Sequence, residues 1–204
     1  HQLSTIEGGM VHTNDKQLYD LLLMLRSHGW GKDLDSETRA TLMKTHGIDE
    51  FHEPFTFFVP GFNVRGDDLR AFLGIRMMGK ADAIVRIRRE NHYRYVENLG
   101  NTVGCQRWDG SAAPCSISFG ALAENREQRK KIVRALDAHN IETRLFSAGN
   151  LGLHPFWTER YGEFHDSVAD RVHECGFFLP NNESIKGKDV DFICSVVKNA
   201  CEEG

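Results

Sequence analysis

Histidines, cysteines, serines and glycines are the residues of this 204-residue sequence that could form a metal site, a nucleophile or a phosphate-binding loop. The ten histidines contain no HExxH pair and the five cysteines no CxxC pair, so neither set has the usual spacing of a zinc site. Gly8-Gly9 lacks the spacing of a phosphate-binding loop or of a dinucleotide-binding fingerprint. Ser4 and Ser27 lack the Gly-x-Ser-x-Gly frame of a nucleophilic serine. Taken singly, these motifs predict no more than a soluble α/β protein.

Composition and charge argue against two classes of partner. The 25 lysines and arginines and 29 aspartates and glutamates give a net charge of −4, whereas proteins that bind the nucleic-acid backbone are usually basic. The longest apolar runs, near residues 21–25 and 55–62, are far shorter than the roughly 18 residues of a membrane-spanning helix. The 40% hydrophobic content is typical of a globular chain, and the length predicts one or two domains. We therefore expect no nucleic-acid or membrane partner.

The cysteines indicate the compartment. They are Cys105, Cys115, Cys175, Cys194 and Cys201. An odd, scattered set argues against a disulfide framework and for reduced thiols. No charged segment followed by an apolar stretch opens the sequence, so no signal peptide is expected. Together these features predict a cytoplasmic location.

The first part of the chain predicts one amphipathic helix between short strands. Residues 10–13 predict a strand, and Asn14 or Asp15 is expected to cap the helix that follows. Residues 32–53 predict an irregular helix or a mobile surface segment, and residues 55–59 predict a strand. The helix has apolar residues at i, i+3, i+4 and i+7, which predicts one buried face. These residues are Leu18, Leu21, Leu22 and Leu25.

Strands and helices alternate in the remainder. A long helical pattern begins at Asp67, and Gly79-Lys80 near its middle is the expected boundary between domains 1–79 and 80–204. Asn125 and Gln128 have the spacing of a capping box. The expected strands are 115–122, 141–146 and 177–180, and the expected helices are 125–140, 164–175 and 188–201, the last burying Val190, Ile193, Val197 and Ala200. We expect an α/β part joined to a smaller α+β module.

Three short motifs in fixed order are more specific than any single residue. They are His1…Ser4-Thr5-x-Glu7-Gly8-Gly9, then Arg26-Ser27-His28-Gly29-Trp30, then Pro60-Gly61-Phe62-Asn63-x-Arg65. Their combination closely resembles the DegT/DnrJ/EryC1/StrS family of nucleotide-sugar aminotransferases and dehydratases. The resemblance covers essentially the whole chain. It implies an α/β fold of the aspartate aminotransferase type (type I, pyridoxal phosphate-dependent).

The resemblance also implies a division of the chain between the family's two domains. Residues 1–79 would form the C-terminal part of the cofactor-binding large domain, and residues 80–204 the small α+β domain. About the first half of the family's domain would then precede position 1. A chain of these 204 residues alone is accordingly expected to be inactive.

His1 is the most informative position within this resemblance. In the family's aminotransferases, the residue six before Glu-Gly-Gly is the lysine that attaches pyridoxal 5'-phosphate covalently. An imidazole cannot form that stable attachment, so the cofactor would rest unattached, most usefully as pyridoxamine 5'-phosphate. A histidine there still moves protons near neutral pH. The substitution resembles the family's sugar 3-dehydratases, and because residues 31–59 contain no cysteine, the branch without an iron–sulfur cluster fits better.

The other two motifs imply further site residues. Asn63 would donate to the cofactor phosphate across a homodimer interface, and Arg65 would pair with a substrate carboxylate or phosphate. A turn asparagine and a solvated arginine are the structural alternatives. His28 is a candidate second acid/base or substrate contact, or a loop histidine that caps a helix end. Gly8, Gly9, Gly29 and Gly61 are all expected at positive φ.

Several residues outside the strongest motifs are weaker candidates. Glu142 and Arg144 alternate on a predicted strand, and Arg144 is a candidate for binding the α-carboxylate of the amino donor, with Glu142 beside the substrate. Lys32 resembles a position that is often basic in these dehydratases. Trp30 is suited either to stacking on a sugar or base or to burial in a core. The segment beginning at His154 resembles a family motif near the active-site mouth, although a packed aromatic turn explains it equally well.

The resemblance implies a nucleotide-sugar 3-dehydratase of deoxysugar and O-antigen lipopolysaccharide biosynthesis. Its substrate would be a 4-keto-6-deoxy nucleotide sugar, glutamate would be the amino donor, and the expected assembly is a homodimer. The sequence is also compatible with two alternatives. One is an ordinary sugar aminotransferase with its lysine elsewhere, although no lysine precedes Lys16. The other is a non-catalytic homologue that binds a nucleotide sugar or regulates.

Overall fold

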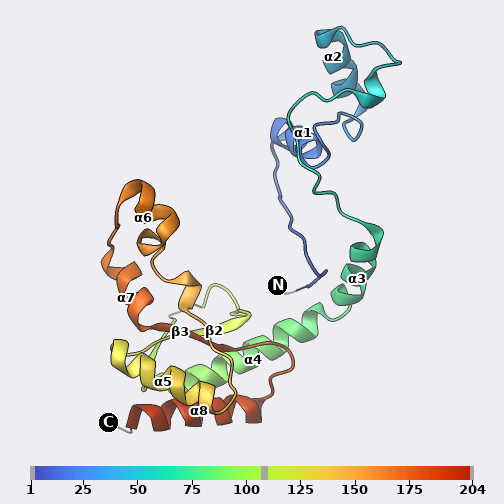
Figure 1. Ribbon diagram of the computed structural model, residues 1–204. Coiled ribbons are helices and arrows are strands. Elements are labelled where there is room, and N and C mark those ends of the chain that lie inside the picture. Colours follow the sequence, from blue (N-terminus) through green and yellow to red (C-terminus); the bar gives the residue numbers. More distant parts are fainter. Residues whose placement is uncertain (1–2, 107–109, 203–204) are drawn as a thin grey trace. The chain divides into compact units, whose positions relative to one another are not determined.

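The computed structural model describes residues 3–106 and 110–202 as a mixture of helices and one small sheet (Figure 1). By its internal contacts the chain divides into two compact units, Leu3–Met78 and a second that contains Gly79–Gly204. None of the described helices is both long enough and apolar enough to cross a membrane.

Short helices form the regular structure of the first unit. They are α1 (Lys16–Leu25), α2 (Ser36–His46), the 3-10 helix η1 (Glu53–Phe55) and α3 (Asp68–Met78). The helix expected after Asn14 or Asp15 is confirmed, and Asp15 is the cap, since its carboxylate accepts from the backbone N–H groups of Gln17 and Leu18.

The buried face of α1 differs from the expected one. Leu23 and Met24 are buried and pack with Leu34, whereas Leu18 and Leu21 are exposed. The expected periodicity was therefore correct for a helix but wrong about which face lies inside this unit.

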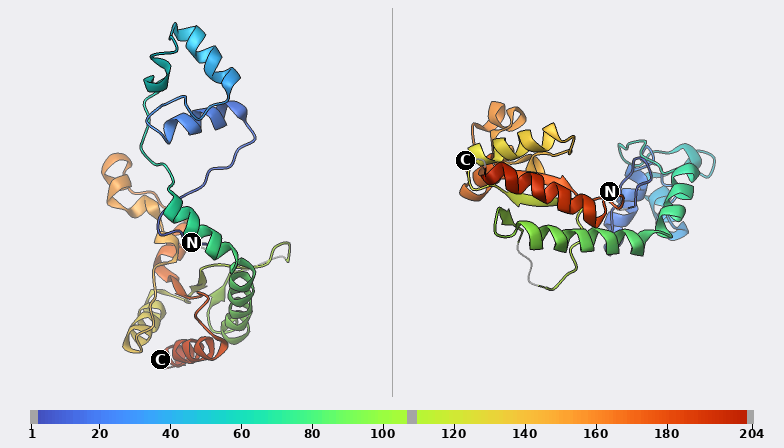
Figure 2. Two further views of the ribbon diagram at one scale, coloured as in Figure 1. Left: turned by 90° about the vertical axis from the view of Figure 1, so that its right-hand side faces the viewer. Right: turned by 90° about the horizontal axis from the view of Figure 1, so that it is seen from below.

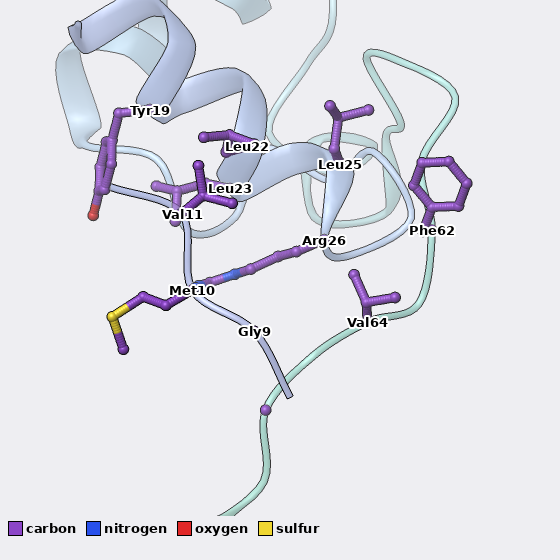
Figure 3. Close-up of a pocket in the computed structure, with 11 residues that line it drawn as sticks. Gly9, Met10, Val11, Tyr19, Leu22, Leu23, Leu25, Arg26, Phe62 and Val64 are labelled. Carbon is purple, nitrogen blue, oxygen red and sulfur yellow. The ribbon is translucent and has the colours of Figure 1, made fainter. Parts of the chain in front are cut away.

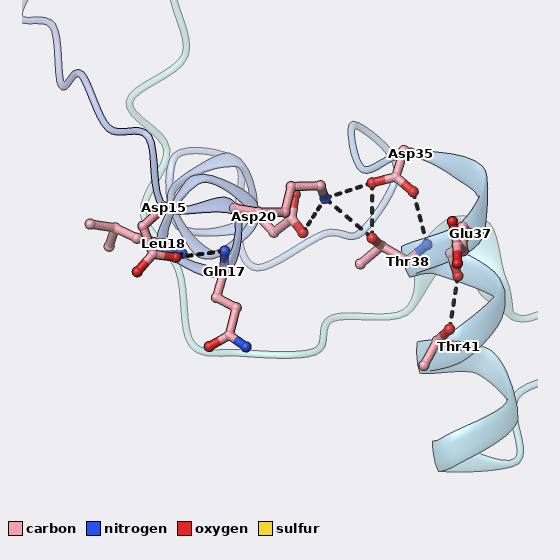
Figure 4. A network of polar contacts seen from close by, with 9 residues as sticks. Asp15, Gln17, Leu18, Asp20, Asp35, Glu37, Thr38 and Thr41 are labelled. Carbon is pink, nitrogen blue, oxygen red and sulfur yellow. Dashed lines mark hydrogen bonds and ion pairs between the residues drawn. The ribbon is translucent and has the colours of Figure 1, made fainter.

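A regular helix replaces the irregular segment expected over residues 32–53. Asp35 begins α2 by accepting from the Thr38 N–H at 3.0 Å (Figure 4). Gly47 ends the helix in a left-handed conformation. The Lys16 ammonium group lies 2.7 Å from the Asp35 carboxylate and so links α1 to the start of α2. This hydrogen bond, with those from Thr38, holds the pKa of Asp35 below its usual range. Capping therefore supports α2 at both ends, and although α2 has no fully buried residue, its Leu42 packs against the cluster of Leu23, Met24 and Leu34.

The two strands expected in this unit are absent. Residues 10–13 form no regular element, and residues 55–59 contribute only one bridge, between Phe57 and Trp30. A β-type sequence forms a strand only where a neighbour completes the hydrogen-bond ladder. In the described part of the first unit, residues 10–13 make no bridge, and residues 55–59 pair only with the short segment at Gly29 and Trp30.

The second unit contains a three-stranded antiparallel sheet. Its strands are β1 (Gly104–Cys105), β2 (Ser118–Leu122) and β3 (Gly176–Pro180), in the spatial order β1-β2-β3. In the β2–β3 register Phe119 lies opposite Leu179 and Ala121 opposite Phe177. The accompanying helices are α4 (Ala81–Leu99), α5 (Arg126–Ala138), α6 (Pro155–Tyr161), α7 (Ser167–Cys175) and α8 (Gly187–Glu202).

One face of the sheet is covered by α4, α5 and α8, with α8 beside both other helices (Figures 1 and 2). Phe119 and Phe177 of the sheet pack there against Tyr95 of α4 and Leu136 of α5, all of them buried. The helix expected at the C-terminal end is confirmed. Its four predicted core residues, Val190, Ile193, Val197 and Ala200, are all buried.

The expected boundaries hold for some elements of the second unit and fail for others. Asn125 caps α5 as expected, and the Gln128 side chain accepts from the Glu124 N–H at 2.6 Å. The helix expected from residue 164 begins at Ser167, because Asp166 provides the cap. Strand β1 and helix α6 were not expected.

The strand expected over residues 141–146 is absent. This segment makes only one bridge, between Arg144 and Phe178, before the chain turns into the 3-10 helix η2 (Phe146–Ala148). The extended backbone stops there because Ser147, Ala148 and Gly149 all have positive φ, which a strand does not contain.

Replacing Tyr95 with phenylalanine is expected to lower the free energy of unfolding of this second unit by about 0.5–1.5 kcal/mol. The Tyr95 hydroxyl is buried and donates to the Pro180 carbonyl oxygen at 2.8 Å, so its removal leaves that oxygen without its donor. Urea unfolding measures the change, and Tyr161→Phe, an exposed tyrosine of α6, is the matched control. Equal midpoints for both variants would show that this hydrogen bond contributes nothing.

Candidate active site

Two of the motifs far apart in the sequence meet along a short antiparallel contact in the first unit. The His28 N–H donates to the Phe62 carbonyl oxygen at 2.7 Å, and the Val64 N–H donates to the Arg26 carbonyl oxygen at 3.0 Å. Ser27 and Asn63 form a β-bridge between these bonds. The backbone therefore places His28 and Asn63 close together, although 34 residues lie between them in the sequence.

Glycine at two positions allows this close approach. Gly29 has φ 95°, and a Cβ there would lie 1.7 Å from the Val59 carbonyl oxygen. Gly61 is not left-handed, yet a Cβ there would lie 2.3 Å from the Gly29 nitrogen. The expectation of positive φ is thus confirmed for Gly29 and wrong for Gly8, Gly9 and Gly61. For Gly61 the requirement is space rather than backbone conformation.

His28 lies at the end of a small group of aromatic rings. Its half-buried imidazole packs edge-on against Trp30, with ring centroids 5.5 Å apart. Trp30 stacks on Phe57, also at 5.5 Å, and the Lys32 ammonium group lies 4.9 Å from the Trp30 ring centroid. His28 itself has the left-handed φ of 63°, which is uncommon for a residue with a side chain. The backbone thus holds a histidine in a costly conformation against an aromatic ring.

Asn63 and Arg65 form a small exposed pair next to this contact. The Arg65 Nε donates to Asn63 Oδ1 at 3.1 Å. The bond uses the carbonyl oxygen of Asn63 and not its NH2 group. An amide NH2 group and a guanidinium group on the surface form a donor set suited to a phosphate or carboxylate.

An apolar groove of about 480 Å³ lies beside the same contact (Figure 3). Met10, Val11, Leu22 and Leu25 line it together with Phe62, Val64 and the Arg26 side chain. The segment that follows Glu7-Gly8-Gly9 thereby meets the other two motifs in one place. Arg26 is the charged residue among those that line the groove, and its guanidinium group also forms an ion pair with Asp33 at 3.0 Å.

Glu142 and Arg144 lie in the second unit, at a polar pocket of about 200 Å³ beside β3. The Arg144 guanidinium group lies 2.7 Å from a Glu142 carboxylate oxygen, and both side chains are more than 70% exposed. The Arg144 carbonyl oxygen accepts from the Phe178 N–H at 2.8 Å, and the Thr143 hydroxyl donates to the Phe178 carbonyl oxygen at 2.7 Å. The backbone is therefore fixed on β3 while the charged groups reach solvent.

Asn181 was not identified from the sequence, yet it helps to build this pocket. It is fully buried, and its NH2 group donates to the carbonyl oxygens of Arg88 and Ser116 at 3.1 and 3.0 Å. The local signal was an asparagine directly after an apolar strand, which is equally typical of a turn.

His28, Asn63 and Arg65 belong to the first unit, Glu142 and Arg144 belong to the second, and His1 lies outside the described residues. His154 precedes α6, and its Nε2 lies 3.0 Å from the Ala148 carbonyl oxygen. Within residues 3–106 and 110–202, no group of three or more His, Cys, Asp and Glu side chains is placed to hold a metal ion.

Comparison with known proteins extends over nearly the whole chain. The DegT/DnrJ/EryC1/StrS aminotransferase family matches residues 1–198. The chain is 28% identical over 204 residues to GDP-4-keto-6-deoxy-D-mannose 3-dehydratase of Escherichia coli O55:H7, with 97% of this chain and 52% of that protein covered. It is also 28% identical over 205 residues to the protein of the same name from Yersinia pseudotuberculosis, covering 97% and 51%. GDP-perosamine synthase of Escherichia coli O157:H7 is 24% identical over 197 residues, covering 96% and 48%.

Solved structures show the same fold. The Escherichia coli GDP-4-keto-6-deoxy-D-mannose 3-dehydratase with bound hydrated pyridoxal phosphate superposes with a TM-score of 0.81 at 24% identity, covering 97% of this chain and 52% of that one. A sugar aminotransferase of Streptococcus pneumoniae in its pyridoxamine phosphate form gives 0.73 at 17%, covering 94% and 46%. The expected aminotransferase-type α/β fold is confirmed.

The chain spans about half the length of the curated relatives that it matches. Within that span, the match includes all three motifs on which the resemblance was based, and it continues through the second unit to residue 198. The chain belongs to the DegT/DnrJ/EryC1/StrS aminotransferase family.

Proposed function

We propose that the whole protein carrying this chain is a nucleotide-sugar 3-dehydratase that uses pyridoxamine phosphate and removes the 3-hydroxyl of a 4-keto-6-deoxy sugar. The observation that carries this proposal is His1, six residues before Glu7-Gly8-Gly9, where the family's aminotransferases have the lysine that holds the cofactor. The names of the two relatives at 28% identity support the same reaction.

The residues of the first unit fit the cofactor chemically. Asn63 and Arg65 offer neutral and cationic donors to a phosphate, and we propose that they serve the site of a neighbouring subunit in a homodimer. Pyridoxamine phosphate supplies an electron sink for breaking bonds at the adjacent sugar carbons. We propose no iron–sulfur cluster, since residues 31–59 contain no cysteine to ligate one.

His1 is proposed as the group that moves protons. With the cofactor bound, its imidazole would take up a proton at the C4' carbon and would give a proton to the oxygen of the leaving 3-hydroxyl. A side chain with a pKa near neutrality can serve as base and then as acid in one cycle. His28, fixed by its backbone bond to Phe62, is proposed as a second acid/base or substrate contact.

The amino donor is proposed to be glutamate, and Arg144 is proposed to bind its α-carboxylate. One solved relative, a GDP-4-keto-6-deoxymannose 3-dehydratase, holds a trapped adduct of pyridoxal phosphate and glutamate, which supports this choice of donor. Another holds GDP-perosamine, which supports a GDP-linked sugar as substrate. A cytoplasmic location and a role in lipopolysaccharide biosynthesis complete the proposal, the latter supported by a Salmonella typhimurium relative named for that process.

Replacing Arg144 with alanine is expected to raise the KM for glutamate about 10- to 100-fold, because a charge-assisted hydrogen bond contributes roughly 1.5–3 kcal/mol. Steady-state kinetics at varied glutamate measures the change. Arg160→Ala, an exposed arginine of α6, is the control. Glu142→Gln is expected to act in the opposite direction, since it releases Arg144 from its ion pair. An unchanged KM in Arg144→Ala would contradict the assignment.

The proposal is tested by adding pyridoxal phosphate and then glutamate to the whole protein. We expect the absorbance of the aldehyde form to be replaced by that of the amine form, because glutamate recharges the cofactor. Cofactor binding without this change would favour the alternative of a non-catalytic, regulatory homologue.

A further inference from the structure

Asn150 is a buried polar residue in the loop that follows Arg144, and its groups connect three segments of the second unit. Its side chain donates to an Asp170 carboxylate oxygen at 2.6 Å and to the Phe164 carbonyl oxygen at 2.9 Å, and it accepts from the Gly152 N–H at 2.8 Å. The Asn150 N–H also donates to His173 Nδ1 at 3.3 Å. The side-chain amide of Asn150 makes all three of its hydrogen bonds to the loop or to α7, and Asn150 is buried from solvent.

The turn just before Asn150 is held in an unfavourable conformation. Ser147, Ala148 and Gly149 have φ values of 45°, 64° and 68°. Left-handed backbone costs a residue with a side chain about 1–2 kcal/mol, so such a turn persists only where its surroundings hold it. At Gly149 a Cβ would lie 2.4 Å from His173 Nδ1, so the turn is pressed against α7.

The same turn is joined to the backbone of Arg144 through β3. Phe146 stacks on Phe178 with ring centroids 4.8 Å apart. A Cβ on Gly120 would lie 2.1 Å from the Phe146 ring, so this ring packs directly against the backbone of β2. Phe178 in turn donates its N–H to the Arg144 carbonyl oxygen. A displaced turn would thus move Phe146 and with it the contact that fixes Arg144.

Asp170 anchors Asn150 from helix α7. Its second carboxylate oxygen lies 3.0 Å from His165 Nδ1, and His165 also faces Glu163. The hydrogen bond from Asn150, with that from His165, keeps the pKa of Asp170 below its usual range, so the carboxylate is ionised at neutral pH. An ionised acceptor makes the bond from Asn150 a charge-assisted one, which is stronger than a neutral pair.

We propose that Asn150, anchored by Asp170, is a positioning residue that holds the left-handed turn 147–149 and thereby sets the position of Arg144 for carboxylate binding. This inference rests on the role of Arg144 in the proposed function. Asn150 itself touches no substrate in this account. Its effect passes through the turn, Phe146 and Phe178.

The test compares Asn150→Ala with Asp166→Ala in the whole protein. Asp166 caps the same helix α7 without contacting the turn, so its loss weakens α7 alone. For Asn150→Ala we expect amide hydrogen exchange of residues 146–153 to rise at least tenfold, with α8 amides unchanged. The KM for glutamate should rise at least tenfold. The dehydration rate constant of protein preloaded with pyridoxamine phosphate should stay within about twofold of wild type.

An exchange of the two side chains, Asn150→Asp with Asp170→Asn, restores one amide–carboxylate bond and should recover part of the KM. Unchanged exchange at residues 146–153 in Asn150→Ala, or an unchanged KM despite faster exchange, would overturn the inference. If Arg144→Ala leaves the KM unchanged while Asn150→Ala raises it, the proposed role of Arg144 fails and the turn acts through another group. The two failures are thus distinguishable.

Discussion

Replacing His1 with asparagine is expected to slow elimination of the sugar 3-hydroxyl by about 100- to 10,000-fold, the usual contribution of a positioned acid/base group. Asparagine has a similar size and can donate hydrogen bonds, but it cannot exchange a proton near neutral pH. The reaction needs one proton removed from the cofactor carbon and one delivered to the leaving oxygen, and both are assigned to His1. Single-turnover assays with preloaded pyridoxamine phosphate measure this step directly.

Two matched variants make the result specific to position 1. His12→Asn removes an exposed histidine of the first unit and is expected to leave the rate unchanged. His1→Lys restores the family's usual residue, and we expect covalent attachment of pyridoxal phosphate together with new 4-aminotransferase activity. Elimination at the wild-type rate in His1→Asn would refute the assigned role.

Replacing Gly29 with alanine is expected to destabilise the contact between residues 25–30 and 57–64 by about 2–5 kcal/mol. This figure is the sum of the cost of a left-handed backbone in a residue with a side chain and the cost of overpacking the contact. The new Cβ would lie 1.7 Å from the Val59 carbonyl oxygen, so one of the two segments has to move. Amide hydrogen exchange at His28, Phe58 and Phe62, whose N–H groups form this contact, measures the loss.

Gly47→Ala is the control for the conformational part of this effect. Gly47 is also left-handed, with φ 64°, but a Cβ there meets nothing within 4 Å. We therefore expect only about 1–2 kcal/mol from backbone strain, felt at the end of α2. Equal effects of the two substitutions would show that the close approach to Val59 is not what requires glycine at position 29.

Helices were predictable from the sequence where a cap and an apolar period coincide. Asp15 and Asn125 both begin helices that the structure confirms, because their side chains accept hydrogen bonds within the first turn. The buried face of the C-terminal helix was equally predictable. Helix α2 was not foreseen as regular, since it is capped by Asp35 and Gly47 at its ends but has no apolar period, and only Leu42 of α2 packs against the core of this unit.

Strands were less predictable because they depend on neighbours elsewhere in the chain. Residues 177–180 were correctly assigned, since β3 pairs along its length with β2. Residues 55–59 and 141–146 have similar composition but make single bridges only. Their pairing depends on tight turns and close contacts, such as those at Gly29 and Gly149. The hydrophobic periodicity of the sequence does not predict such turns and contacts.

The site could be predicted in part. The motifs containing His28 and Asn63 were recognised separately, and the structure brings them together through backbone hydrogen bonds. Asn150 and Asn181 were missed because a lone asparagine in a loop resembles any turn residue. Their importance is visible only in what their buried amide groups contact.

The central claim, dehydration rather than amino transfer, is tested most directly by the products formed from GDP-4-keto-6-deoxy-D-mannose. The whole protein is supplied with pyridoxal phosphate and glutamate, and the sugar and free ammonia are quantified. We predict a sugar that has lost its 3-hydroxyl, with one ammonia released for each sugar converted. A sugar that retains its 3-hydroxyl and carries a 4-amino group, with no ammonia released, would contradict the account.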